Sequence, residues 1–316
     1  MNKSAFYSAV AAVLAIGLAT PAHALITRAW VSGKGVDAAG CGAPTNACRT
    51  FQYVLSNILA PGGEIDVLDP AGYGPMTINF AVRIINDGVG TAGVQQATAG
   101  QNAITINAGP NDKINLKGLT IEGLGVAQNG IQFNSGNVLR LMGLSIANFA
   151  GVGVNFVPNN GSGANSFLII SGGSIGGNGG GQVVNRPSGG TNGYANLQDH
   201  CTLVRGPIGI TVDGSASSAG KAQTTISHCT IEFSSAVAVE ASGEAAVMID
   251  ESALLNNTTT LSADGANALI ALNASFIEGA ATISSTSNGA IIATFSNNGV
   301  VGYGTFGTAF SPQPLH

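Results

Sequence analysis

The chain has 316 residues, of which 46 are glycine, 45% are hydrophobic and only 9% are charged. This combination excludes an intrinsically disordered chain, which needs low hydrophobicity and high charge, and the glycines lack the every-third spacing of collagen. The net charge is −5, and no run of clustered lysine and arginine occurs, so a nucleic-acid-binding surface is not expected.

The first 24 residues have the three parts of a secretory signal peptide. Lys3 supplies a short basic start, residues 5–18 are apolar, and residues 22–24 read Ala-His-Ala, a cleavage pattern. A membrane anchor is the alternative, but the apolar run is shorter than the roughly 20 residues that a spanning helix needs. We therefore expect residues 1–24 to be removed and the chain to be exported, to the periplasm, the cell surface or the medium. No later segment is long and apolar enough to span a membrane.

Residues 25–62 are predicted to form an N-terminal segment of their own. Cys41 and Cys48 bracket a short loop, and an exported chain meets an oxidising compartment, so we expect a disulfide between them. Apolar residues at positions 51, 54, 55, 58 and 59 follow a helical period, and Pro61 ends the pattern. One short helix here would cover the open core of the coils that follow.

A short pattern recurs through residues 63–316. It consists of a small or apolar residue, then Ser or Thr, then an aliphatic residue, and these aliphatic residues are Ile121, Ile146, Ile175, Leu203, Ile231, Leu255 and Ile277. Their spacings lie between 22 and 29 residues, the range of a solenoid with one structural unit per repeat. Each repeat also holds a further segment with period-two alternation, and none has room for a helix of ten or more residues as well.

Short strands and turns stacked in parallel form a β-helix. The predicted fold class is therefore all-β, a parallel β-helix of roughly ten coils. A β-sandwich and a propeller are the alternatives, but a sandwich needs no such self-similarity and a propeller blade usually takes about 40 residues or more. Bulky aromatic residues return near the C-terminus at Phe295, Tyr303, Phe306 and Phe310. We expect them to close the last coil, and an oligomer contact is the alternative.

The beginning of the mature chain resembles a known family. The motifs are Trp30-Val31-Ser32-Gly33, the pair Cys41 and Cys48 followed by Arg49-Thr50-Phe51, Gly62-Gly63-Glu64-Ile65-Asp66-Val67, and Gly72-Tyr73. They are similar to the opening of secreted bacterial right-handed parallel β-helix proteins of the pectin-lyase-like superfamily, and the likeness extends over nearly the whole mature chain. The resemblance implies export and a right-handed β-helix. It implies no single activity, because the superfamily includes lyases, hydrolases, adhesins and members of unknown activity.

Two His-Cys pairs, His200-Cys201 and His228-Cys229, occupy the same position of adjacent repeats. Side chains alternate along a strand, so both cysteines share the inward face with the repeat aliphatics, and both histidines point outward. This arrangement excludes a Cys-His nucleophile pair and a Cys₂His₂ zinc site. We expect two stacked core thiols, since in-register strands hold Cβ atoms farther apart than a disulfide prefers. A disulfide between coils is the alternative, and the two histidines alone would make a weak metal site.

The other charged residues are scattered, and Asp199 and Arg205 are the best of the weak candidates for catalysis. A polysaccharide lyase would show acidic and basic residues clustered on one outer face, commonly with Ca²⁺, and no Asp-Asp pair of the hydrolase type occurs. No phosphate loop, nucleophile elbow or dinucleotide fingerprint stands in a suitable context. No cofactor or metal is predicted, apart from Ca²⁺ if the protein is a lyase.

The leading hypothesis is therefore an exported, non-catalytic β-helix that binds a glycan or a cell-surface component along its flank. The first alternative is a polysaccharide lyase or glycoside hydrolase of the pectin-lyase-like superfamily, and the second is a structural surface protein. The oligomeric state stays open.

Overall fold

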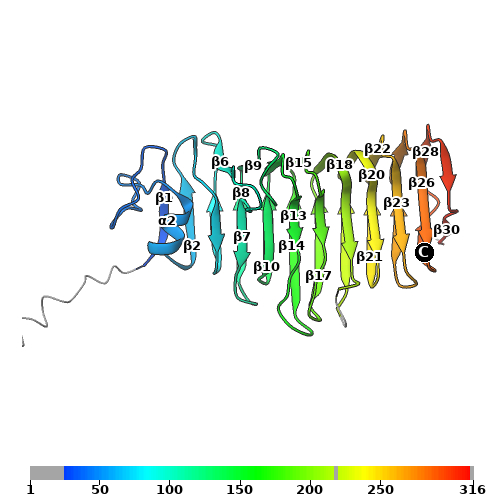
Figure 1. Ribbon diagram of the computed structural model, residues 1–316, viewed down its shortest axis with the longest axis horizontal. Helices are drawn as coiled ribbons and strands as arrows, with labels where there is room; N and C mark the ends of the chain where they lie inside the picture. The colour runs from blue at the N-terminus through cyan, green and yellow to red at the C-terminus, as the bar shows by residue number, and fades with distance from the viewer. Residues whose placement is uncertain (1–24, 217–219, 314–316) are drawn as a thin grey trace, which may run out of the picture.

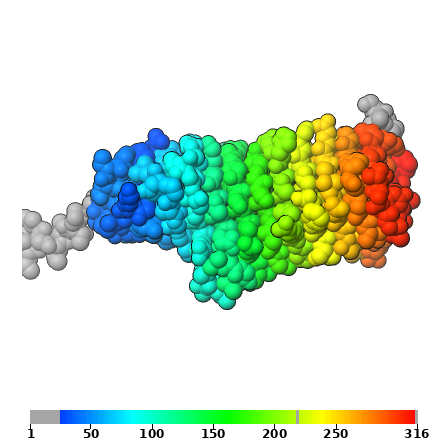
Figure 2. Space-filling view, turned by 90° about the horizontal axis from the view of Figure 1, so that it is seen from above, coloured from blue at the N-terminus to red at the C-terminus, as the bar shows by residue number. Residues whose placement is uncertain are grey.

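The computed structural model describes residues 25–216 and 220–313, which form an elongated solenoid of parallel strands. The strands lie side by side along the long axis (Figure 1), and the colours run in chain order from one end of the molecule to the other (Figure 2). This confirms the predicted all-β parallel β-helix. The predicted signal peptide lies outside the described residues. No helix in the described part of the chain is long and apolar enough to cross a membrane.

One side of the solenoid is a twelve-stranded sheet in which neighbouring strands pair in parallel. Its strands are β1 (Ile26–Val31), β2 (Leu59–Val67), β5 (Val82–Ile85), β8 (Lys113–Lys117), β11 (Val138–Met142), β14 (Asn165–Ser171), β17 (Asn192–Gln198), β19 (Ala222–Ser227), β21 (Ala245–Asp250), β24 (Leu269–Asn273), β27 (Ile291–Thr294) and β30 (Ser311–Pro312). Each turn adds one strand to this sheet. The number of coils differs slightly from the roughly ten predicted.

The rest of each turn contributes to an eighteen-stranded sheet. Its strands are β3 (Ala71–Gly72), β4 (Met76–Ile78), β6 (Ala92–Gln95), β7 (Ile104–Asn107), β9 (Leu119–Glu122), β10 (Ile131–Ser135), β12 (Ser145–Ala147), β13 (Val152–Phe156), β15 (Ser174–Gly176), β16 (Gly181–Asn185), β18 (Thr202–Asp213), β20 (Thr230–Ser242), β22 (Ala253–Leu255), β23 (Thr259–Asp264), β25 (Phe276–Glu278), β26 (Thr282–Ser287), β28 (Gly299–Val301) and β29 (Thr305–Gly307). In two turns the two segments merge into one long strand, β18 and β20.

The repeat aliphatics form the core, stacked from turn to turn. Ile121, Ile146, Ile175, Leu203 and Ile231 pair in register and are at most 3% exposed. The alternation of apolar and polar residues places every second side chain inside, where removal from water stabilises the stack. One of the predicted repeat aliphatics, Leu255, was assigned wrongly by one residue. Ile231 pairs with Leu254, which is buried, whereas Leu255 pairs with Glu232 on the outer side.

The N-terminal cap differs from the prediction in its order. The short helix α2 (Phe51–Asn57) begins at the N-cap Thr50, whose side chain accepts a hydrogen bond from the Tyr53 amide, and its apolar face is buried. However, β1 precedes this helix and pairs with β2, so the solenoid starts before the cap. The predicted division at residue 62 falls inside β2, and the N-terminal segment is therefore continuous with the sheet.

The loop between β1 and α2 covers the outer edge of β1. The disulfide expected between Cys41 and Cys48 is present, with the two Cα atoms 5.1 Å apart. The Trp30 amide donates to the Gly42 carbonyl at 3.0 Å, and the Ser32 amide donates to the Cys48 carbonyl at 2.9 Å. These bonds satisfy backbone groups that an edge strand would otherwise leave open.

Cys201 and Cys229 are buried and stacked, but the prediction of free thiols was wrong. They form a disulfide, and their Cα atoms are 4.7 Å apart, within the range that a disulfide spans. The prediction assumed flat strands. The preceding residues, His200 and His228, instead have φ of 64° and 54°. Each cysteine therefore stands at a tight corner rather than within a regular ladder, and the spacing of flat parallel strands does not apply.

Candidate functional site

Polar and aromatic side chains gather on the outer face of the twelve-stranded sheet. We use the name flank for the outward side chains of β5, β8, β11, β14, β17 and β19. The inward residues of these strands are buried, so the alternate residues face solvent. Six strands about 4.8 Å apart give this face a length of about 24 Å.

The N-terminal half of the flank is basic. Arg83, Lys113, Lys117 and Arg140, here called the basic patch, are all exposed on β5, β8 and β11. Arg83 and Arg140 flank Asn115 in register on the two neighbouring strands. Arg83 forms an ion pair with Glu64 at 3.1 Å and Lys117 with Asp87 at 2.5 Å. Lys113 and Arg140 make no ion pair with any residue in the described ranges, so their charges are available to a ligand.

The next strands of the flank carry a pair of stacked aromatic rings. Phe167 on β14 and Tyr194 on β17, here called the aromatic platform, pair in register, and their ring centroids are 5.2 Å apart at an interplanar angle of 17°. Phe167 is 37% exposed. A shallow hollow of about 340 Å³ lies beside the rings and is also lined by Asn196 and Gln223. The platform thus combines apolar ring faces with amide donors and acceptors.

These groups together suit a sugar chain that carries carboxylates. Guanidinium and ammonium groups form charge-assisted hydrogen bonds with carboxylates. Aromatic rings offer a rigid apolar surface for the C–H faces of sugar rings, and amides can bond to hydroxyl groups. The register joins the two parts directly, because Phe167 pairs with Val138 of β11, the strand that carries Arg140.

The two predicted catalytic candidates are not brought together. Asp199 lies at a corner with φ of 60°, and its carboxylate accepts hydrogen bonds from Ser171 at 2.5 Å and Gln198 at 3.0 Å. These bonds, the one from Ser171 above all, lower the pKa of Asp199. Arg205 occupies a different corner inside β18, and no side-chain contact joins it to Asp199 within the described ranges. The pair therefore forms no catalytic arrangement.

The two histidines lie outside the core. His200 and His228 have ring centroids 6.5 Å apart, and His228 Nε2 is 2.5 Å from a carboxylate oxygen of Glu251. Among the residues that the structure describes, no group of three or more His, Cys, Asp or Glu side chains could hold a metal ion. The arrangement gives a histidine paired with an acid, both of them exposed.

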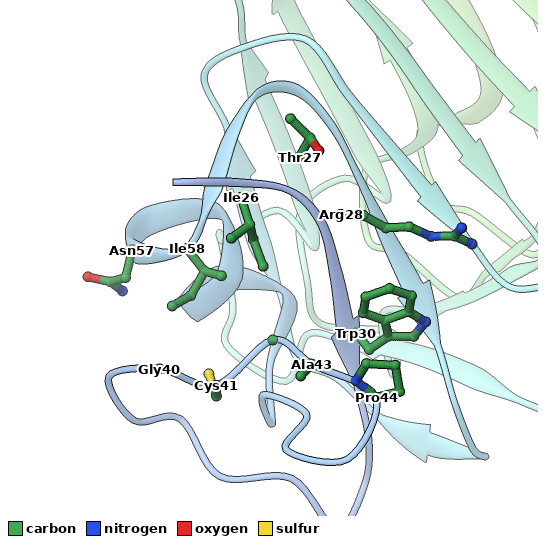
Figure 3. A pocket seen from close by; sticks show the side chains of 11 residues that line it. Ile26, Thr27, Arg28, Trp30, Gly40, Cys41, Ala43, Pro44, Asn57 and Ile58 are labelled. Carbon is green, nitrogen blue, oxygen red and sulfur yellow. The ribbon is translucent and has the colours of Figure 1, made fainter. Parts of the chain in front are cut away.

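A second hollow, of about 470 Å³, lies at the N-terminal end between β1, the disulfide loop and the end of α2 (Figure 3). Its lining is largely apolar and includes Ile26, Trp30, Pro44 and Ile58. The one charged group, Arg28, is already bound to Asp66 at 2.6 Å and lies 5.1 Å from the centroid of the Trp30 ring.

Comparison with known proteins supports the fold. No protein-family model and no curated protein matches this chain. The solved structure of an alginate lyase from Paenibacillus sp. strain FPU-7 is similar, with a TM-score of 0.57 and 14% sequence identity, over 83% of this chain and 96% of that chain. At this identity the likeness shows a shared β-helix fold.

The basic patch was missed in the sequence because its members are spread over residues 83–140 and form no run. Only the register of β5, β8 and β11 brings them together. The signal was nevertheless present, as cations at outward positions of successive repeats.

Proposed function

We propose that this protein binds an acidic polysaccharide along its flank without cleaving it. The observation that carries this proposal is the continuity of the basic patch with the aromatic platform on one outer face. Two disulfides, of the kind that persists in exported proteins, support a location outside the cytoplasm, where such glycans occur.

A glycan fits the flank better than a nucleic acid does. Strong nucleic-acid binding uses about six to ten phosphate contacts. The basic patch has four cations, and two of them are paired with the carboxylates of Glu64 and Asp87.

The direct test is calorimetric titration with alginate and polygalacturonate, with neutral dextran as the comparison ligand. Replacing the two unpaired cations in Lys113→Ala/Arg140→Ala should weaken binding of the acidic glycans at least tenfold, about 1.4 kcal/mol, and reduce its sensitivity to salt. The variant Phe167→Ala/Tyr194→Ala should weaken binding without changing the salt dependence.

Lys34→Ala is the matched control, because Lys34 is an exposed cation outside the flank. It should leave the affinity unchanged. Equal affinity of wild type and Lys113→Ala/Arg140→Ala for acidic glycans would refute the proposal. Absence of binding to every glycan tested, together with tight association of the protein with the cell envelope, would favour a structural surface protein instead.

A polysaccharide lyase is the second candidate, and the position of Lys113 and Arg140 near Asn115 favours it. Elimination beside a uronate needs a group that neutralises the carboxylate and a base that takes the neighbouring proton. In this candidate Arg140 has the first role, and Lys113, as the neutral amine after loss of its own proton, has the second. Formation of unsaturated sugar ends from alginate or polygalacturonate, lost in Lys113→Ala, would establish it. Repeating the assay with a chelator would test a requirement for Ca²⁺.

A further inference from the structure

The outer face of the twelve-stranded sheet continues past the flank onto β21, β24 and β27. One row of outward side chains runs along this face, and each residue of the row pairs in register with the next. From the N-terminal side the row consists of Lys113, Val138, Phe167, Tyr194, Gln223, Ala246, Leu269 and Ile291. The basic patch, the aromatic platform and the last three strands therefore form one continuous surface.

Beyond the aromatic platform this surface is apolar. The apolar extension, as it is called here, consists of the outward side chains Ala246 and Met248 on β21, Leu269 and Ala271 on β24, and Ile291 on β27. Leu269 is 38% exposed and Ile291 is 46% exposed, and the two pair in register. Single exposed aliphatic residues are common on protein surfaces. These form a group that continues an existing binding face and so lengthens it.

The charges on this surface are unevenly placed. The strands β5, β8 and β11 carry the four cations of the basic patch, whereas β14, β17, β19, β21, β24 and β27 contain no Lys or Arg. Lys221 lies at the margin, directly before β19. The three strands of the apolar extension carry one charged side chain, Asp250, whose carboxylate accepts a hydrogen bond from Asn273 at 2.6 Å. A section with cations is thus followed by a section without them.

An ionised carboxylate on the apolar extension would lose water without gaining a partner. Such desolvation costs free energy unless a cation or a hydrogen-bond donor compensates for it, and Asp250 would add like-charge repulsion. An uncharged sugar at the same place buries C–H surface against Leu269 and Ile291 without this cost. The two sections of the surface therefore favour different sugars.

We propose that the preferred ligand is a glycan whose carboxylate-bearing sugars and uncharged sugars are grouped in separate stretches. This inference rests on the proposed binding of an acidic polysaccharide along the flank, and it adds the order of the charges along that chain. The carboxylates lie on the basic patch near Lys113 and Arg140. The uncharged stretch runs over the aromatic platform and onto the apolar extension. A glycan with a carboxylate on every sugar engages the first section alone.

The length of the row sets the length of the ligand. The eight strands from β8 to β27 lie about 4.8 Å apart, which gives the row a length of about 34 Å. A sugar unit in an extended chain is about as long as the spacing between two strands. An oligosaccharide of about eight sugars therefore covers the row.

Calorimetric titration with oligogalacturonates of about this length tests the proposal. Five probes share one backbone. One has every carboxylate free and one has every carboxylate methyl-esterified. Three are half-esterified, with the free carboxylates grouped at the reducing end, grouped at the non-reducing end, or alternating along the chain. One of the two grouped isomers should bind about tenfold more tightly than the alternating isomer, although their composition and net charge are the same. It should also bind more tightly than the fully free oligomer.

The variant Leu269→Lys/Ile291→Lys should abolish this preference, because it places cations on the apolar extension. The fully free oligomer should then bind more tightly than it binds the wild type, and the advantage of the grouped isomer should disappear. Leu124→Lys/Val126→Lys is the matched control. Leu124 and Val126 are 50% and 44% exposed and lie between β9 and β10 of the other sheet, so this variant should keep the wild-type order of affinities. Thermal melting checks that both variants are folded.

Two results with the wild type would overturn the inference. One is a fully free oligomer that binds as tightly as the better grouped isomer, and the other is equal affinity for the grouped and alternating isomers. Binding would then follow the number of carboxylates alone, and the proposed binding of acidic glycans would stand. Equal affinity for all five probes, or binding of none of them, would instead contradict the proposed function as well.

Discussion

The two ends of the solenoid each carry an aromatic cluster, but they use it in opposite ways. At the N-terminal end Phe51 and Tyr73 have ring centroids 5.0 Å apart, and both are completely buried. At the C-terminal end Tyr303 is 44% exposed, and Phe306 and Phe310 are half-buried. Both clusters lie at an end of the stack of parallel strands, and only the N-terminal one is completely buried.

The difference lies in what surrounds each cluster. The N-terminal end has a helix, a disulfide loop and charged groups, including Asp69, whose carboxylate accepts hydrogen bonds from Ser32, Gly33 and Tyr73. The C-terminal end has no charged side chain in residues 279–313. In a solenoid each turn contacts only its neighbours, so an end must be capped or covered to be stable. The comparison indicates a tightly packed cap at the N-terminal end and a more exposed aromatic cluster at the C-terminal end.

The sharpest test of this contrast removes one ring from each end. Phe51→Ala should lower the free energy of unfolding by about 3–5 kcal/mol, because it leaves a cavity in a fully packed cluster. Phe310→Ala should cost less than about 1 kcal/mol, because that ring is already partly in water. Urea denaturation measures both. Equal losses would show that the two ends are packed alike.

The disulfide loop gives the second largest effect. Replacing both residues in Cys41→Ala/Cys48→Ala should lower the free energy of unfolding by about 2 kcal/mol, as expected for a short closed loop. It should also loosen the cover of β1 and cause concentration-dependent association through that edge, which sedimentation would detect.

Cys201→Ala/Cys229→Ala is the control for this effect. That disulfide lies within the stack and covers no edge, so its loss should reduce stability without causing association. Association of both variants would mean that the loop does not protect the edge.

The fold could be predicted from the sequence because it depends on periodicity. The aliphatic repeat fixes which residues face inward, and Ile121, Ile146 and Ile175 stack as their spacing predicts. The free thiols were mispredicted for a local reason, the positive φ of His200 and His228, which no spacing reveals. The repeat aliphatic Leu255 was misassigned because Leu254 precedes it, and two adjacent leucines fit the pattern equally well.

The candidate site could not be predicted in the same way. Phe167 and Tyr194 are ordinary aromatic residues until the register of β14 and β17 stacks them on the outer face. Arg83 and Arg140 become neighbours of Asn115 only when three turns are aligned. A binding face on a solenoid runs across the turns, so it depends on the register of neighbouring strands. That register is set by connecting loops whose lengths vary from turn to turn.

A smaller effect is expected from a single hydroxyl group at each end. Tyr73 is buried, and its hydroxyl lies 2.5 Å from the backbone carbonyl of Asp69 and 2.9 Å from its carboxylate, so Tyr73→Phe should lower the free energy of unfolding by about 1 kcal/mol. Tyr303→Phe should change it by less than about 0.5 kcal/mol, because Tyr303 is exposed and its hydroxyl has no hydrogen bond within the described ranges. Thermal unfolding of the two variants side by side would show whether the contrast extends to single polar contacts.

The smallest effect concerns the stability in acid, to which Asp69 at the N-terminal end should contribute. Hydrogen bonds from the Ser32 hydroxyl and the Gly33 amide lower the pKa of Asp69 in the folded state. A carboxyl whose folded pKa is lowered contributes stability above its unfolded value of about 4, and this contribution is lost as the pH falls through the folded pKa. Asp69→Asn should therefore flatten the fall in stability below about pH 4, and Ser32→Ala should flatten it in part. Tyr303→Phe at the other end changes no charge at acidic pH, so it should keep the wild-type fall. An Asp69→Asn variant with an unchanged acid profile would mean that this carboxylate does not hold the N-terminal end in place.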